Sequence, residues 1–135
     1  MSVDNKTLAD IRSEVCNTTV KWMLAFGTVG VALSLARILE TGWRPAMGLH
    51  VALWLIIAAL HVFENRIHYA VRAGTLVGAM FLIALAGNLT VGPVAGNAFY
   101  ASSAILAAVF FGEIGGIAVV VLSGVAIAGH YLGLK

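Results

Sequence analysis

The most polar internal stretch of the chain is "HVFENRIHYAVRAG", residues 61–74, which contains groups able to bind a metal, move a proton or form ion pairs. His61 and Asn65 are four residues apart, as are Glu64 and His68, so each pair would share one face of a helix. A Glu–His pair supplies half of a metal site, and a third ligand would have to come from another segment. We therefore interpret this stretch as interfacial polar residues rather than as a metal centre.

Two further histidines, His50 and His130, stand near the ends of long apolar runs. Imidazoles from two facing helices could ligate haem or a metal, or could sense pH, and plain packing at the membrane interface is the alternative. Hydroxyl groups within another apolar run could form interhelical hydrogen bonds or line a small cavity. The candidates for sensing a ligand or signal are His50, His130, Tyr100, Ser102 and Ser103.

The sequence contains no arrangement typical of catalysis. Its serines stand in apolar runs without a neighbouring base, and no glycine-rich phosphate loop is followed by a lysine. Cys16 is the single cysteine, which excludes an internal disulfide and a thiolate metal cluster. We predict no catalytic residues, no metal and no cofactor, and hence a chain that is not itself an enzyme.

The composition decides the class of protein that must position these residues. Hydrophobic residues make up 61% of the 135 residues and charged residues 10%, whereas soluble domains have about 45–50% and about 25%. The net charge is only +2, and no basic cluster is interleaved with aromatic residues, so a nucleic-acid partner is excluded. The sequence predicts an all-α integral membrane protein whose main partner is the lipid bilayer.

One membrane span needs about 20 residues, so five spans with short connections use nearly the whole chain. We expect a bundle of five transmembrane helices in a domain covering residues 22–135. The predicted spans are about 22–39, 47–63, 73–89, 98–111 and 117–134.

Residues 1–21 precede the first span and are more polar. Leu8, Ile11 and Val15 recur at helical spacing. We expect a cytoplasmic amphipathic helix that lies on the membrane surface or leads straight into the first span, and a flexible tail is the alternative.

The connections are predicted from turn residues. Gly42 and Pro45 should interrupt the helix between the first two spans. Asn88, Gly92 and Gly96 should lie in an uncharged loop before the fourth span. Glycines four residues apart let helix backbones approach closely. Such pairs occur at Gly74/Gly78, Gly92/Gly96, Gly112/Gly116 and Gly129/Gly133.

The basic residues predict the orientation. Five of the eight, Lys6, Arg12, Lys21, Arg66 and Arg72, fall on the side of the N-terminus when the spans alternate in direction. Since Lys and Arg are enriched in cytoplasmic loops, we expect a cytoplasmic N-terminus. Five spans would then bring the C-terminus out on the other side, and a cytoplasmic domain following residue 135 would need one more span.

In this topology residues 61–74 form a cytoplasmic turn that could couple the second and third spans to an output. Glu113 lies in another turn on the same side, where an ion pair with Arg66 or Arg72 is expected to contribute little, about 0–1 kcal/mol. The residues assigned to this coupling region are His61, Glu64, Asn65, Arg66, His68, Tyr69, Arg72 and Glu113.

Residues 66–73 have the form Arg-aliphatic-x-aromatic-x-x-Arg-Ala, and a glycine-rich segment and a Gly112–Gly116 turn follow. With Gly42–Trp43, these features make residues 20–134 resemble the N-terminal multi-span membrane region of bacterial sensor histidine kinases and diguanylate cyclases. Glu113 departs from the family, whose turn at this place commonly carries Arg.

The resemblance implies a sensor in the bacterial inner membrane that passes a signal on by helix movement, as a homodimer or higher homo-oligomer. A kinase or cyclase domain would supply the output of a two-component or cyclic-dinucleotide system. One alternative is a small haem- or metal-binding membrane protein using His50 and His130. A small transporter or channel ranks last, because the spans contain almost no charge and no helix broken at mid-membrane.

Overall fold

The computed structural model describes residues 7–90 and 93–133, and all regular structure in these two segments is α-helical. The helices are α1 (Leu8–Ala36), α2 (Ile38–Thr41), α3 (Pro45–Val62), α4 (Tyr69–Thr90), α5 (Pro93–Phe111) and α6 (Glu113–Tyr131). In the described part, four helical segments are long and apolar enough to cross a membrane, and Gly96–Phe111 within α5 is a shorter apolar run. The predicted all-α membrane fold is confirmed.

The ends of the helices follow from local sequence. The Thr7 hydroxyl accepts a hydrogen bond from the Asp10 backbone N–H at 3.3 Å, and the Asp10 carboxylate accepts one from the Thr7 N–H at 2.9 Å, which together cap α1. Pro45 begins α3, where its fixed φ suits the first turn and its missing N–H costs nothing. Gly42 and Gly112 adopt φ values of 71° and 81°, which glycine tolerates best, and they reverse the chain.

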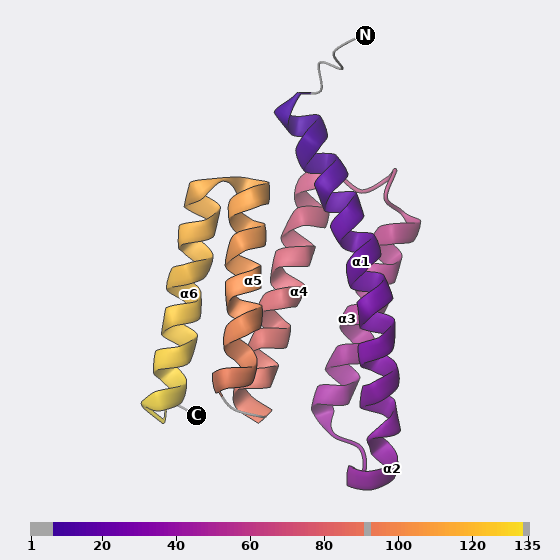
Figure 1. The fold of residues 1–135 in the computed structure, drawn as a ribbon, viewed down its shortest axis with the longest axis vertical. Helices are drawn as coiled ribbons and strands as arrows, with labels where there is room; N and C mark the ends of the chain where they lie inside the picture. The colour runs from indigo at the N-terminus through magenta and orange to yellow at the C-terminus, as the bar shows by residue number, and fades with distance from the viewer. Residues whose placement is uncertain (1–6, 91–92, 134–135) are drawn as a thin grey trace.

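Successive long helices run antiparallel (Figure 1). The start of α1, the connection from α3 to α4 and the turn between α5 and α6 lie at one end of the bundle, called here the N-terminal end (Figure 1). The short helix α2 and the end of α6 lie at the opposite end.

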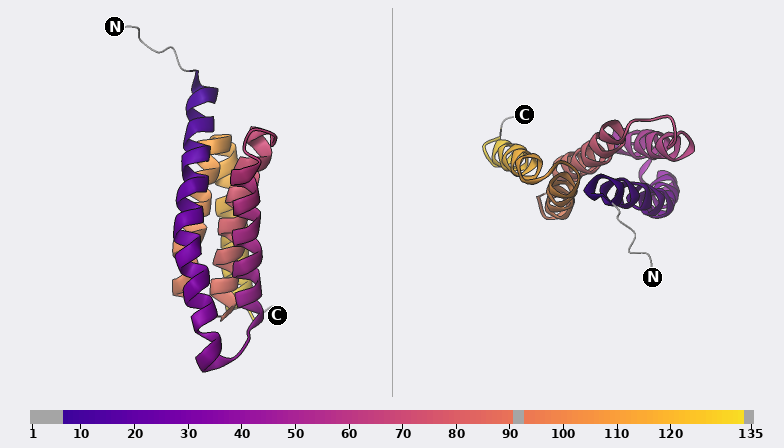
Figure 2. Two further views of the ribbon diagram at one scale, coloured as in Figure 1. Left: turned by 90° about the vertical axis from the view of Figure 1, so that its right-hand side faces the viewer. Right: turned by 90° about the horizontal axis from the view of Figure 1, so that it is seen from above.

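The long helices form two groups. The first group is α1 with α3, and the second is α4, α5 and α6, in which α5 packs against both neighbours. α1 and α4 lie side by side near the N-terminal end and separate towards the other, as Figures 1 and 2 show. Contact between the two groups is therefore concentrated near one end.

The interface between α4 and α5 has a regular antiparallel register. The Tyr69 hydroxyl donates to the Phe110 carbonyl at 3.1 Å, and the Ser103 hydroxyl donates to the Val77 carbonyl at 3.0 Å. In a membrane, hydrogen bonds of this kind contribute about 0.6 kcal/mol each.

The best buried core lies where α1, α3, α4 and α5 meet. Cys16, Ala73 and Leu76 have no exposed surface, and Phe110 is 2% exposed. The same cluster includes Val20, Leu53, Ile57, Leu60 and Ala107. This cluster packs the two helix groups together.

Where the structure describes it, the N-terminal segment is part of a long helix and not a separate surface helix or a flexible tail. α1 runs without a break from Leu8 to Ala36, so the described part of residues 1–21 leads straight into the first predicted span. Residues 1–6 lie outside the described residues. The capping of α1 by Thr7 and Asp10 explains why helix begins before the apolar run does.

The loop predicted around Asn88, Gly92 and Gly96 was too long. Asn88 lies in α4 and Gly96 lies in α5, while Gly92 is outside the described residues. A Cβ added to Gly96 would be 2.7 Å from the Ala84 carbonyl oxygen. Gly96 is therefore a helix-packing glycine rather than a turn residue, because only its small size permits this approach.

We predict that Gly96→Ala lowers the free energy of unfolding by about 1–3 kcal/mol, as overpacking does when backbone must move. Gly78→Ala is the matched control in α4, since a Cβ there would meet nothing within 4 Å. It should leave stability unchanged or slightly raised. Unfolding of the purified protein in micelles, followed by circular dichroism, measures both, and equal stability of the two variants would contradict the packing role of Gly96.

Candidate functional site

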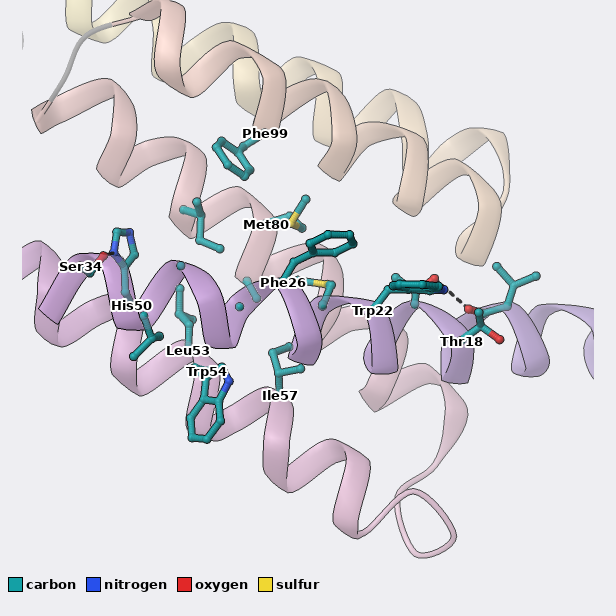
Figure 3. Close-up of a pocket in the computed structure, with 18 of the residues that line it drawn as sticks. Thr18, Trp22, Phe26, Ser34, His50, Leu53, Trp54, Ile57, Met80 and Phe99 are labelled. Carbon is teal, nitrogen blue, oxygen red and sulfur yellow. Dashed lines mark hydrogen bonds between the residues drawn. The ribbon is translucent and has the colours of Figure 1, made fainter. Parts of the chain in front are cut away.

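A groove with a volume of about 800 Å³ lies between the two helix groups. Side chains from α1, α3, α4 and α5 line it, and most of them are apolar. Figure 3 shows Phe26, Met80 and Phe99 around its middle. The groove lies where the helix groups separate.

Small residues of α1 make room for the groove. Gly27 and Gly30 both line it. A Cβ on Gly27 would approach Trp54 Cδ1 to 3.2 Å, whereas a Cβ on Gly30 would meet nothing within 4 Å. The Trp54 indole N–H also donates to the Thr28 hydroxyl at 3.0 Å, which joins α3 to α1. Contacts with Trp54 therefore fix α1 against α3, and α1 leaves open space in the groove at Gly30.

Polar side chains lie at both ends of the groove, with Glu14, Thr18 and Thr19 at one end and a hydrogen-bonded pair at the other. The Ser34 hydroxyl of α1 and Nδ1 of His50 on α3 are 2.9 Å apart and share a hydrogen bond. Both residues line the groove and both are half-buried. Figure 3 places this pair at one end, with Trp22 near the other.

Ser34 uses its hydroxyl differently from most hydroxyl residues in these helices. The usual partner is the carbonyl four residues earlier in the same helix, which satisfies the hydroxyl locally. This bond is made by Thr19, Thr28, Thr41, Thr75, Thr90, Ser102 and Ser123. The hydrogen bond between Ser34 and His50 therefore brings together two side chains that can also form hydrogen bonds with a bound molecule.

The other predicted sensing residues lie elsewhere. His130 is exposed at the end of α6, and α6 makes no contact with α3 among the described residues. One chain thus does not bring His50 and His130 together, so it gives no support for a shared haem or metal site. Nor does any group of three or more His, Cys, Asp or Glu in the described segments have the geometry to hold a metal ion.

The three hydroxyl candidates lie on α5 and do not line the groove. Ser102 bonds its own helix at the Ala98 carbonyl, and Ser103 ties α5 to α4. Tyr100 is 3% exposed and packs edge-on against Phe81, with 5.3 Å between ring centroids. Tyr100 and the nearby buried Asn88 of α4 have side-chain polar atoms without a protein partner.

The coupling turn is built from short-range contacts. The chain leaves α3 at Val62, and His61 Nδ1 lies 3.7 Å from a carboxylate oxygen of Glu64. The backbone N–H of Ala70 donates to Nδ1 of His68 at 3.3 Å, at the start of α4. Asn65 and Arg66 are exposed.

The expected ion pair of Glu113 with Arg66 or Arg72 is not found in the part of the chain that the structure describes. Arg72 instead donates a hydrogen bond to the side-chain carbonyl of Asn17 on α1. Arg72 points towards α1 because it lies on the buried face of α4, next to Ala73, whereas Glu113 is exposed.

The contact between Asn17 and Arg72 joins the two helix groups at the N-terminal end. Arg72 is only 7% exposed, and its Nε has no protein partner. A buried charge with few hydrogen bonds depends strongly on each one, since losing its acceptor costs about 1–3 kcal/mol or more. The fully buried Cys16 adjoins Asn17 in the chain, so its thiol can report on this contact.

Sequence reasoning missed Asn17, Ser34, Trp54 and Gly30. A signal existed for Ser34, because Ser34 and His50 each stand eight residues from Gly42. A helical hairpin that turns at Gly42 must place them at the same depth. Asn17 carried no comparable signal, because its partner is 55 residues away.

We predict that Asn17→Ala makes Cys16 react about tenfold faster with a maleimide, as expected if local opening becomes about 1.4 kcal/mol easier. The measurement is the labelling rate of the purified protein by mass spectrometry. Asn65→Ala is the matched control, because Asn65 is exposed in the turn. An unchanged rate in Asn17→Ala would show that this contact does not hold the helix groups together.

Comparison with known proteins agrees with these features. A family model for MASE11 matches residues 10–135, nearly the whole chain. No curated protein and no solved structure matches it. The sensory membrane region expected from the sequence is supported at this level, and the link to a histidine kinase or a diguanylate cyclase stays a prediction. The chain belongs to the MASE11 family, and MASE domains are membrane-associated sensory domains.

Proposed function

We propose that this chain is the membrane-embedded sensory module of a bacterial receptor and that it transmits a signal by movement of its two helix groups. The observation that carries the proposal is the groove of about 800 Å³ between them. A molecule bound there contacts α1 and α3 on one side and α4 and α5 on the other. Binding would therefore favour one relative position of the groups, which is how a ligand shifts a conformational equilibrium.

The contacts between the groups favour movement rather than a rigid bundle. α4 and α5 pack along their length, as do α1 and α3, whereas the two groups meet mainly around Cys16 and Arg72. Helix shifts of about 1–2 Å are enough to pass a signal in known switches. The Asn17–Arg72 contact is the natural pivot, because it lies at the end where the groups touch.

We further propose that the N-terminus is cytoplasmic in a multi-pass inner-membrane arrangement. The distribution of Lys and Arg in the sequence supports this orientation, with five of eight basic residues on the N-terminal side. Residues 63–68, which connect α3 to α4, would then face the cytoplasm. The predicted turn of residues 61–74 was too long, because Tyr69 and Arg72 lie in α4. His68 and Tyr69 would pass movement of α3 and α4 to an output there, and Tyr69 extends the connection to α5 through Phe110.

The receptor type proposed is a sensor histidine kinase or a diguanylate cyclase, acting as a homodimer or higher homo-oligomer. The resemblance of residues 66–73 to such membrane regions supports it. The module would be non-enzymatic, and the output domain would perform the chemistry.

We predict that Asn17→Leu changes the basal output of the native receptor about fivefold or more, which is the lower range of allosteric coupling. Phosphorylated histidine or cyclic di-GMP in cells is the measurement. Asn97→Leu, at an exposed position near the start of α5 and outside the coupling turn, should leave the output unchanged. An unchanged output in Asn17→Leu, in protein whose Cys16 labelling shows that the contact has opened, would contradict transmission by movement of the helix groups.

A further inference from the structure

We propose that the groove binds a long-chain fatty acid, with the carboxylate at the Ser34–His50 pair and the acyl chain along the apolar part. This inference rests on the proposed sensory function, because it names the class of molecule that the sensor would detect.

The shape of the groove suits a single extended chain. Ser34 and Thr18 both line it and lie sixteen residues apart on α1, which corresponds to roughly 24 Å along a helix. Apolar side chains from four helices face this length, and Gly30 leaves space beside them. Polar residues line both ends of the groove, Ser34 and His50 at one and Glu14, Thr18 and Thr19 at the other. The side chains between them are apolar over a length that matches the tail of an amphiphile.

The end of the groove at Ser34 and His50 can hold a carboxylate. His50 shares Nδ1 with Ser34 at 2.9 Å, and a histidine has a second ring nitrogen that can donate a hydrogen bond to an anion. In the other tautomer Nδ1–H donates to the Ser34 oxygen, and the Ser34 hydroxyl donates to the anion instead. Hydrogen bonds to a charged acceptor are about twice as strong as neutral ones.

The charges around that end favour an anion. Arg37 follows Ser34 by three residues, about 4.5 Å further along the helix axis, and Arg44 precedes α3 at the same end of the bundle. Glu40 on α2 is the acidic residue there, so the two arginines outnumber it. The other end of the groove carries Glu14 instead. Arg12 and Lys21 also lie near that end on α1 but do not line the groove. The carboxylate of Glu14 therefore disfavours an anionic head there, which orients the proposed ligand with its head at His50.

Binding is tested with the full chain in phosphatidylcholine nanodiscs. The probe is a long-chain fatty acid that carries a photoactivatable diazirine near the end of its tail, and unlabelled oleic acid is the competitor. We expect saturable labelling of one probe per chain, with cross-linked peptides from the groove walls of α1 and α4. Labelling that oleic acid does not displace would overturn the proposal, because it would reflect bulk lipid contact alone.

Gly30→Phe should weaken binding about tenfold or more, because the ring would fill the groove where no atom of the protein now stands. Gly129→Phe is the matched control on α6, where a Cβ likewise meets nothing within 4 Å and the groove is absent. It should bind as the original chain does. Equal binding by both variants would overturn the proposed location.

The head is tested with His50→Phe and Ser34→Ala. Each should weaken binding of the fatty acid about tenfold and leave binding of the corresponding fatty alcohol nearly unchanged, since the lost interaction is with the charged head. His130→Phe, at the exposed histidine of α6, should have no effect. Equal preference for acid and alcohol in the original chain would overturn the assignment of the carboxylate, and thermal unfolding confirms that each variant is folded.

These measurements need no output domain, so they separate the two proposals. A chain that fails to bind the fatty acid but whose receptor output still responds to Asn17→Leu would lose the ligand assignment and keep the sensory role. A chain that binds the fatty acid while its receptor output ignores both Asn17→Leu and the fatty acid would keep the site and lose transmission.

Discussion

The hydrogen bond between Arg72 and Asn17 is the constraint on which the arrangement of the helices depends. Arg72 is only 7% exposed, so its guanidinium must form hydrogen bonds within the protein. The side-chain carbonyl of Asn17 on α1 accepts one of them. The contact fixes the height of α1 against α4 and places Cys16, Val20 and Leu76 in a common core. The helix groups are held at this end and separate below it.

That separation produces the groove, and each helix contributes a different property to it. α1 supplies glycine and serine, α3 supplies His50 and Trp54, and α4 and α5 supply the apolar far wall. α5 is fixed on α4 by Tyr69, Ser103 and the close approach at Gly96. One wall of the groove therefore belongs to the tightly packed α4–α5 pair, and the other belongs to α1 and α3.

Apolar run lengths predicted the helical class, because a membrane span requires a long apolar segment whatever its neighbours are. The apolar run lengths did not predict that Asn88 and Gly96 lie inside helices. A glycine in the sequence indicates a turn, and its role in packing becomes clear only when the neighbouring helix backbone is known. Gly96 and Gly116 do make close contacts, whereas Gly74 and Gly78 do not. We identified His50 from the sequence but predicted His130 as its partner. The sequence indicates how deep a residue lies in the membrane, but it does not show which helices are adjacent.

The most direct test of movement between the helix groups is a distance measurement across the groove. Spin labels at the exposed Leu39 of α2 and Val94 of α5, in a Cys16→Ser background, report on both groups. Double electron–electron resonance should show a shift of about 2 Å or more, or a clear broadening, when Asn17 is replaced by Leu. Labels at Val94 and Leu132, both in the second group, should keep their distance. Unchanged distributions for both pairs would contradict the account, because the contact could then be broken without moving the helices.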